Sequence, residues 1–129
     1  MAIVPDLRLA TVEAREALPP EVPRADAVFN AAHAALVLEA ITRDPGLLTV
    51  ALRDRLHEDA RLSLVPEVAD LMDDLRRVRV PACVSGAGPT VLAFETEDGP
   101  DLRPILDSRP TWRVLRPGVR AAGFEVVRS

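Results

Sequence analysis

The residues of this 129-residue chain that could do chemistry are mainly arginines and small hydroxyl-bearing residues. All 16 basic residues are Arg, and none is Lys. The lack of Lys excludes Schiff-base catalysis, a lysine general base and the lysine of a Walker A phosphate loop. The planar guanidinium of Arg instead suits carboxylates and phosphates, which it can bind through two parallel hydrogen bonds.

A glycine-containing loop is the first candidate for such binding, and it consists of Ser85, Gly86, Ala87, Gly88, Pro89 and Thr90. Its two glycines allow backbone N–H groups to approach an anion closely, and the hydroxyls of Ser85 and Thr90 add further donors. The loop fits neither the GxxxxGK[ST] nor the GxGxxG template. The pattern alone favours a different interpretation, a tight connection between two strands with both glycines at positive φ.

Thr11 and Arg15 are the second candidate, because they lie one helical turn apart and therefore on one face. Together, a hydroxyl and a guanidinium could hold a small carboxylate or phosphate. The alternative interpretation is that Thr11 caps a short helix while Arg15 is solvated, and without further context this alternative is favoured.

Asp54, His57 and Arg61 form the third candidate, since they recur at helical spacing and could line one surface. A buried Arg61 would clamp a carboxylate, and His57 could act as an acid or base. No Ser or Cys nucleophile stands at a recognisable spacing from His57, so the catalytic residue stays unknown. The favoured alternative is a solvent-facing set of weak ion pairs with a structural histidine.

Cys83 is the single cysteine, so the chain cannot form an internal disulfide. With only His33 and His57 beside it, no spacing typical of a zinc or haem site exists, and we expect no metal site. Ala82 and Val84 flank Cys83 in a predicted buried strand, where apolar surroundings should raise the pKa of the thiol and leave it unreactive.

Composition also argues against several partners. The formal net charge of -4 leaves no basic surplus for phosphates, and the chain has few aromatic side chains for base stacking. We therefore expect neither nucleic acid nor a membrane as partner. No segment approaches the ~18 apolar residues of a membrane span, and no secretory signal opens the sequence, so we expect a cytoplasmic location.

The elements that must position these residues follow from hydrophobic spacing and from Pro and Gly signals. Helices are predicted at residues 11–17, 26–41, 44–54, 66–77 and 102–106. Strands are predicted at residues 1–4 with a continuation at 7–9, and at 80–84, 91–94, 112–115 and 124–127. Because strands and helices do not alternate regularly, the pattern favours one α+β domain with helices packed on one face of the sheet.

The order of the candidate motifs along the chain resembles the C-terminal half of the homoserine kinase family, within the GHMP kinase superfamily. The matching blocks are Thr-Val-Glu-Ala-Arg at 11–15, Asp-Arg-Leu-His-Glu at 54–58 followed by Arg61, and Ser-Gly-Ala-Gly-Pro-Thr at 85–90. The resemblance extends from about residue 2 to about residue 127. The loop is shared across the superfamily, whereas the other two blocks point to homoserine.

This resemblance implies a GHMP kinase C-terminal domain-like fold with an antiparallel sheet, formed by residues 1–129. It also implies a reaction in which the γ-phosphoryl group of ATP, held with Mg²⁺, passes to the hydroxyl of L-homoserine on the route to threonine. Arg15 and Arg61 would clamp the homoserine carboxylate beside Thr11. The segment 85–88 would shape the phosphate end of the cleft, and Asp54 and His57 would support the site.

The family's N-terminal ATP-binding domain has no counterpart here. Its Pro-x-x-x-Gly-Leu-Gly-Ser-Ser phosphate loop and its acidic Mg²⁺ ligand match no stretch of the sequence. We therefore expect half of an enzyme, with a complementary N-terminal kinase half or a second copy as protein partner. Two alternatives stay open: a GHMP kinase for another small alcohol such as mevalonate, and an α+β module that binds an amino acid or a protein without turnover.

Overall fold

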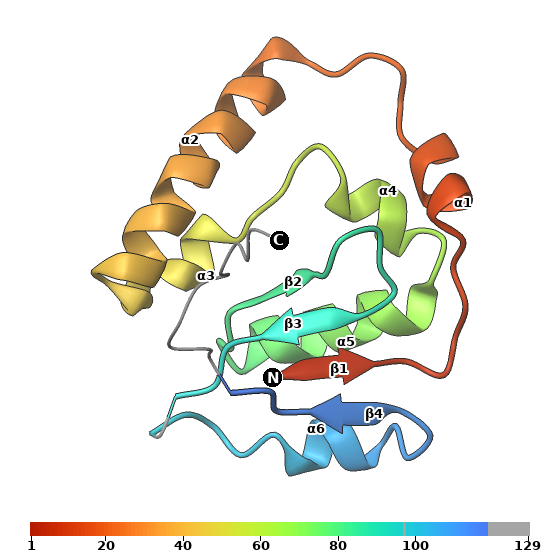
Figure 1. Cartoon of the computed structure of the whole chain (residues 1–129), viewed down its shortest axis with the longest axis vertical. Helices are drawn as coiled ribbons and strands as arrows, with labels where there is room; N and C mark the ends of the chain where they lie inside the picture. The colour runs from red at the N-terminus through yellow and green to blue at the C-terminus, as the bar shows by residue number, and fades with distance from the viewer. Residues whose placement is uncertain (97, 119–129) are drawn as a thin grey trace, which may run out of the picture.

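The computed structural model describes residues 1–96 and 98–118. At its centre is a four-stranded antiparallel sheet with the strand order β2-β3-β1-β4 (Figure 1). The strands are β1 (Ala2–Val4), β2 (Ala82–Val84), β3 (Val91–Ala93) and β4 (Arg113–Leu115). The first strand of the sequence therefore lies inside the sheet, where Ile3 pairs with both Val91 and Val114.

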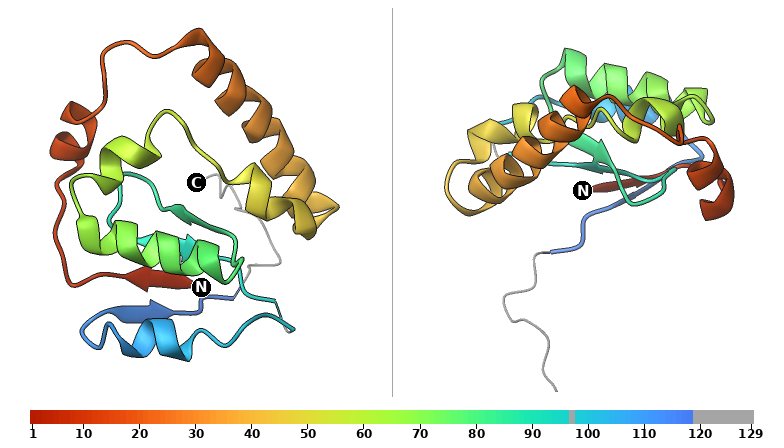
Figure 2. Two further views of the ribbon diagram at one scale, coloured as in Figure 1. Left: turned by 180° about the vertical axis from the view of Figure 1, so that it is seen from behind. Right: turned by 90° about the horizontal axis from the view of Figure 1, so that it is seen from above.

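The helical elements of the described residues are α1 (Thr11–Glu16), α2 (Arg24–Thr42), the 3-10 helix η1 (Pro45–Leu47), α3 (Leu48–Ala51), α4 (Glu58–Leu62), α5 (Pro66–Arg77) and α6 (Arg103–Asp107). Helices α5 and α6 lie on one face of the sheet, while α2 and α3 pack on each other to one side (Figure 2). The predicted α+β class, with an antiparallel sheet and helices on one face, is confirmed.

Helix α5 forms for reasons that are visible in its sequence. Pro66 occupies its first turn, where no helical N–H is needed, and charges of opposite sign at its two ends suit the helix dipole. Its apolar residues recur on one face, and that face is buried: Val68, Leu71, Met72 and Leu75. These side chains belong to the main core together with the sheet residues Ile3, Val91 and Ala93.

A second, smaller core lies between α2 and α3, where Ala40, Leu48 and Ala51 are buried. The predicted helix is present, but three residues of its regular apolar spacing point outward. Val28 is 60%, Leu38 67% and Ile41 60% exposed. Because α2 carries apolar residues on nearly all faces, its contact with α3 decides which side is buried.

The predicted helix over residues 44–54 is shorter in the structure. Asp44 caps its start as expected, since its side chain accepts a hydrogen bond from the Gly46 N–H at 3.0 Å. The helical segment ends at Ala51. The reason is a turn at residues 53–57, where the Asp54 carboxylate accepts hydrogen bonds from the backbone N–H groups of Leu56 and His57.

Other predicted boundaries also change. The continuation of the first strand at residues 7–9 is wrong, since Pro5 follows the strand and offers no N–H for pairing. The strand predicted at residues 124–127 lies outside the described residues. Among residues 1–96 and 98–118, no helix is both long enough and apolar enough to cross a lipid bilayer.

Candidate functional site

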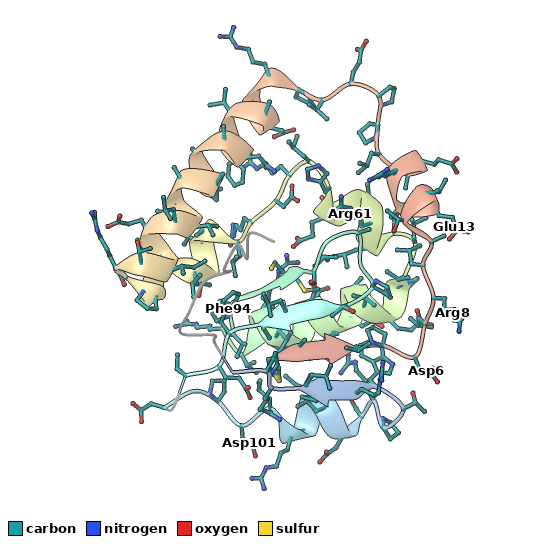
Figure 3. The ribbon with its side chains drawn as sticks, in the orientation of Figure 1. Asp6, Arg8, Glu13, Arg61, Phe94 and Asp101 are labelled. Carbon is teal, nitrogen blue, oxygen red and sulfur yellow. The ribbon has the colours of Figure 1, made fainter. Side chains whose placement is uncertain are left out.

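Arg61 and the loop at residues 85–90 come together in the structure. Arg61 lies in the last turn of α4, and its Nη1 donates a hydrogen bond to the Gly86 carbonyl oxygen at 2.8 Å (Figure 3). Its Nε is buried and has no hydrogen-bond partner among the described residues. Two sequence-predicted candidates, separated by more than twenty residues, therefore meet at one place.

The loop itself is a tight connection between β2 and β3. The Ser85 N–H donates to the Thr90 carbonyl at 2.8 Å, and the Gly88 N–H donates to the Ser85 carbonyl at 3.2 Å. Gly86 and Gly88 have φ values of 62° and 89°, as the hairpin interpretation predicts. A Cβ at Gly88 would also lie 3.2 Å from Val84 Cγ1, so glycine is required there for two reasons.

Helix α1 lies beside α4 and the loop (Figure 1). Leu9, just before α1, is 3.8 Å from the position of a Cβ on Gly88, and α1 shares a surface hollow with Leu64 and Val65. Thr11 and Arg15 are both exposed on this helix. The convergence of the Arg15 and Arg61 guanidinium groups on one ligand remains a prediction.

Thr11 does not cap α1, so the interpretation of Thr11 as a helix cap is wrong. Thr11 is already the first helical residue, and Ala10 stands at the N-cap position with extended backbone. The Ala10 N–H is instead satisfied by the Glu13 carboxylate at 3.1 Å. Because the Glu13 carboxylate accepts this hydrogen bond at the start of the helix, the Thr11 hydroxyl is not needed for the cap.

Asp54 and His57 lie together, but not on a helical face with Arg61. Both precede α4, and the His57 Nδ1 is 3.0 Å from Asp54 Oδ2. Burial raises the pKa of Asp54, but hydrogen bonds from Asn30, Leu56 and His57 outweigh it, so this pKa lies below its usual value. Asp54 is therefore a charged acceptor that organises the turn leading into α4.

Sequence analysis missed two contacts that attach this turn and the start of α4 to other helices. Asn30 on α2 donates from Nδ2 to Asp54 Oδ1 at 2.6 Å. Glu58, the first residue of α4, is buried and pairs with Arg76 of α5. Burial raises the pKa of Glu58 above its usual value, against the opposing effect of Arg76. Asn30 lies among Phe29, Ala31 and Ala32, and a polar residue in this apolar stretch was the available signal for the first pair. Nothing in the local sequence indicates the second.

A hollow of about 440 Å³ borders the Asp54 turn but not the Arg61 contact. Its lining includes Phe29, Arg53, Asp54, Glu58 and Arg76, so charges of both signs face it. Within the part of the chain that the structure describes, no group of three His, Cys, Asp or Glu side chains could hold a metal ion. The pKa of the Cys83 thiol is raised, chiefly by burial and also by the charge of Glu58, as its apolar strand predicts.

Comparisons with known proteins identify the family to which this fold belongs. The sequence model of the family "GHMP kinases C terminal" matches residues 31–102. Homoserine kinase from Streptomyces avermitilis is 46% identical over 127 residues, and that from Streptomyces coelicolor is 41% identical over 127 residues; each match covers 98% of this chain and 41% of the relative. The crystal structure of homoserine kinase from Cytophaga hutchinsonii matches with a TM-score of 0.67 and 26% identity, over 75% of this chain and 31% of that one.

The chain thus spans about 41% of the length of these two curated relatives. Arg61 and the 85–90 loop lie inside the segment that the family model matches, and Thr11 and Arg15 lie outside it. With more than half of its residues matched by that model, and with the strand order and hairpin loop described above, the chain belongs to the C-terminal domain family of the GHMP kinases.

Proposed function

We propose that the chain is the C-terminal, substrate-binding part of a homoserine kinase, which transfers the γ-phosphoryl group of ATP to the side-chain hydroxyl of L-homoserine. The observation that carries this proposal is the hydrogen bond from Arg61 to the Gly86 carbonyl. It joins the arginine assigned to the substrate carboxylate to the loop assigned to the phosphate end of the cleft. Similarity to homoserine kinases over 98% of the chain supports the choice of substrate.

In this proposal the loop holds one terminal nitrogen of the Arg61 guanidinium, and the other binds the substrate. Its Nη1 is engaged by the loop, which leaves the second terminal nitrogen to donate to a carboxylate oxygen. Arg15, exposed on the neighbouring α1, would bind the same carboxylate with Thr11 beside it. Holding the carboxylate in this way aligns the homoserine hydroxyl with the phosphorus, and phosphoryl transfer depends mainly on such positioning.

The nucleotide would be held chiefly by a complementary N-terminal half. The phosphate loop and acidic Mg²⁺ ligand implied by the resemblance match no stretch of this sequence. Mg²⁺ would neutralise charge on the phosphates, and the segment 85–88 would border them from this side. As part of an amino-acid biosynthetic enzyme, the assembled protein would act in the cytoplasm, either with that half alone or as a homo-oligomer.

A chimera tests the proposal. The part of the Streptomyces avermitilis homoserine kinase that precedes the matched segment is joined in frame to this chain. We expect homoserine-dependent ATP consumption by the chimera and none by the 129-residue chain alone. Arg15→Gln and Arg61→Gln should each lower kcat/KM for homoserine about 30-fold or more, because each removes one partner of a charge pair.

Arg43→Gln is the matched control, because Arg43 is an exposed arginine at the C-cap of α2 that pairs with Glu39, four residues before it. It should leave turnover unchanged. A folded chimera that phosphorylates mevalonate but not homoserine, with Arg15 and Arg61 dispensable, would support a kinase for another small alcohol. A folded chimera that binds ligand without turnover would support a binding module. Robust turnover by this chain alone would contradict the assignment of the nucleotide to a complementary N-terminal half.

A further inference from the structure

Helix α2 and the turn before α4 are joined by a polar contact that the proposed reaction does not use. We infer that Asn30 is a positioning residue for Arg61, acting through the Asp54 turn; this inference rests on the proposed function. We call Asn30, Asp54 and Arg55 the latch. The latch joins the long helix α2 to the turn that precedes α4, a helix of five residues that carries Arg61.

The Asn30 amide uses both of its polar atoms in the latch. Its Nδ2 donates to Asp54 Oδ1 at 2.6 Å, and its Oδ1 accepts from the Arg55 backbone N–H at 2.9 Å. One side chain of α2 thus holds two consecutive residues of the turn. An amide suits both roles, because it carries a donor and an acceptor side by side, whereas an ionised carboxylate cannot donate and an ammonium group cannot accept.

The latch reaches α4 through the Asp54 carboxylate. Asp54 Oδ1 accepts from the N–H groups of Leu56 and His57 at 2.7 and 3.0 Å, and α4 begins at the next residue, Glu58. A helix of this length has no stability of its own, so its direction depends on what holds its ends. The turn and the Glu58–Arg76 pair hold its start, and Arg61 reaches Gly86 from its last turn.

Arg55 strengthens the same connection from its side chain. Its guanidinium carbon lies 3.9 Å above the Phe29 ring, and its Nη1 is 3.3 Å from Asp26 Oδ1. Both partners belong to α2: Asp26 lies four residues before Asn30, and Phe29 directly precedes it. The turn is therefore attached to α2 by backbone and side-chain contacts, and a change at Asn30 should alter where α4 points.

The test is the exchange of the Arg61 Nε proton with water, followed by ¹⁵N NMR on the 129-residue chain. Because Nε is buried, we expect this proton to exchange slowly in the unmodified chain. Asn30→Asp places a second carboxylate against Asp54, so we expect exchange to become about tenfold faster or more, as loss of a hydrogen bond to a charged group allows. Asn30→Ser, which removes the amide without adding charge, should act in the same direction with a smaller effect.

Leu36→Ala is the matched control, because Leu36 packs in the small core of α2 and α3 but lies outside the latch. When the variants are compared under conditions of equal global stability, Leu36→Ala should leave the exchange rate of the Arg61 Nε proton unchanged. The double exchange Asn30→Asp with Asp54→Asn restores a donor and acceptor across the contact and should recover part of the protection. Equal effects of Leu36→Ala and Asn30→Asp, or no effect of Asn30→Asp and Asn30→Ser, would overturn the inference.

The kinetic arm uses the chimera described above. Asn30→Asp should raise KM for L-homoserine about tenfold while changing kcat less, since it misplaces a binding group rather than the reacting atoms. Leu36→Ala should change neither. If the chimera without substitutions has no homoserine kinase activity, the proposed function fails, whereas the Arg61 exchange rates still decide whether Asn30 positions Arg61.

Discussion

Helices α5 and α2 bury their apolar residues in different ways. The apolar residues of α5 lie on one face, which packs on the sheet, and four of them are buried. Helix α2 is longer and apolar on nearly all faces, yet Ala40 is the only buried residue among residues 24–42. Amphipathic spacing therefore specifies which face is covered, and apolar content alone does not.

The difference also appears in how polar groups secure each helix. Asp74 of α5 binds Arg109 at 2.7 Å and so ties the helix to the segment after α6. On α2 the polar residues Asp26 and Asn30 reach the turn before α4 instead. We conclude that α5 is secured by its core and a flanking ion pair, whereas α2 depends on α3 and on polar contacts.

Truncating the centre of the α5 face should have the largest effect. Leu71 is fully buried, so Leu71→Ala should lower the free energy of unfolding by about 2 to 5 kcal/mol through lost burial and an unfilled cavity. Urea denaturation of both proteins measures this change. A loss below about 1 kcal/mol would show that the α5 face is not the main core.

Leu48→Ala should weaken the small core between α2 and α3 by about 2 kcal/mol, the low end for a buried leucine. Because this core is separate from the α5 core, the change should be local. Amide hydrogen exchange should speed up at Leu36 and Val37 and stay slow at Leu71 and Met72. Equal acceleration in both helices would mean that the two cores unfold as one unit.

The Asp74–Arg109 pair makes a smaller, pH-dependent contribution. Hydrogen bonds from Arg109 and then Arg77 hold the pKa of Asp74 below its usual value of 3.8. Its stabilisation is therefore present above pH 3.8 and is lost as pH falls through the lower pKa of the folded protein. Asp74→Asn should cost about 1 kcal/mol at pH 7 and much less in strong acid, as urea denaturation at several pH values can measure.

Leu38→Glu should have the smallest effect on folding. Leu38 is 67% exposed, so the free energy of unfolding should change by no more than about 0.5 kcal/mol. The exposed apolar residues of α2 should nevertheless cause the unmodified chain to self-associate. Sedimentation should show less association for the variant, and monomeric behaviour of the unmodified chain would contradict this expectation.

Local signals predicted those elements whose causes are local. The bounds of α5 were predictable because Pro66 and a continuous amphipathic pattern mark them. The helix expected to continue to residue 54 ends at Ala51, because the Asp54 carboxylate accepts hydrogen bonds from backbone N–H groups of the following turn. Asn30, which lies 24 positions earlier in the sequence, donates to the same carboxylate. The outward direction of Leu38 likewise depends on tertiary contacts, which the spacing of apolar residues does not contain.

The features of the candidate site likewise divide into those that local sequence determines and those that depend on tertiary contacts. Positive φ at Gly86 and Gly88 was predictable, since glycine between two strands favours it. The contact of Arg61 with Gly86 links residues far apart in the sequence, and only the resemblance to a family suggested that they act together. Asn30 carried no motif, and its role depends on how α2 packs against a distant turn.

The position of β1 has a consequence for how the protein folds. This strand is made of the earliest residues, yet it pairs on both sides with strands from the later part of the chain, β3 and β4. The sheet cannot close until residues as distant in sequence as Ala2 and Leu92 have met, and such pairings raise its contact order. Refolding should therefore be slow for a domain of this size, in milliseconds to seconds, and limited by the docking of β1.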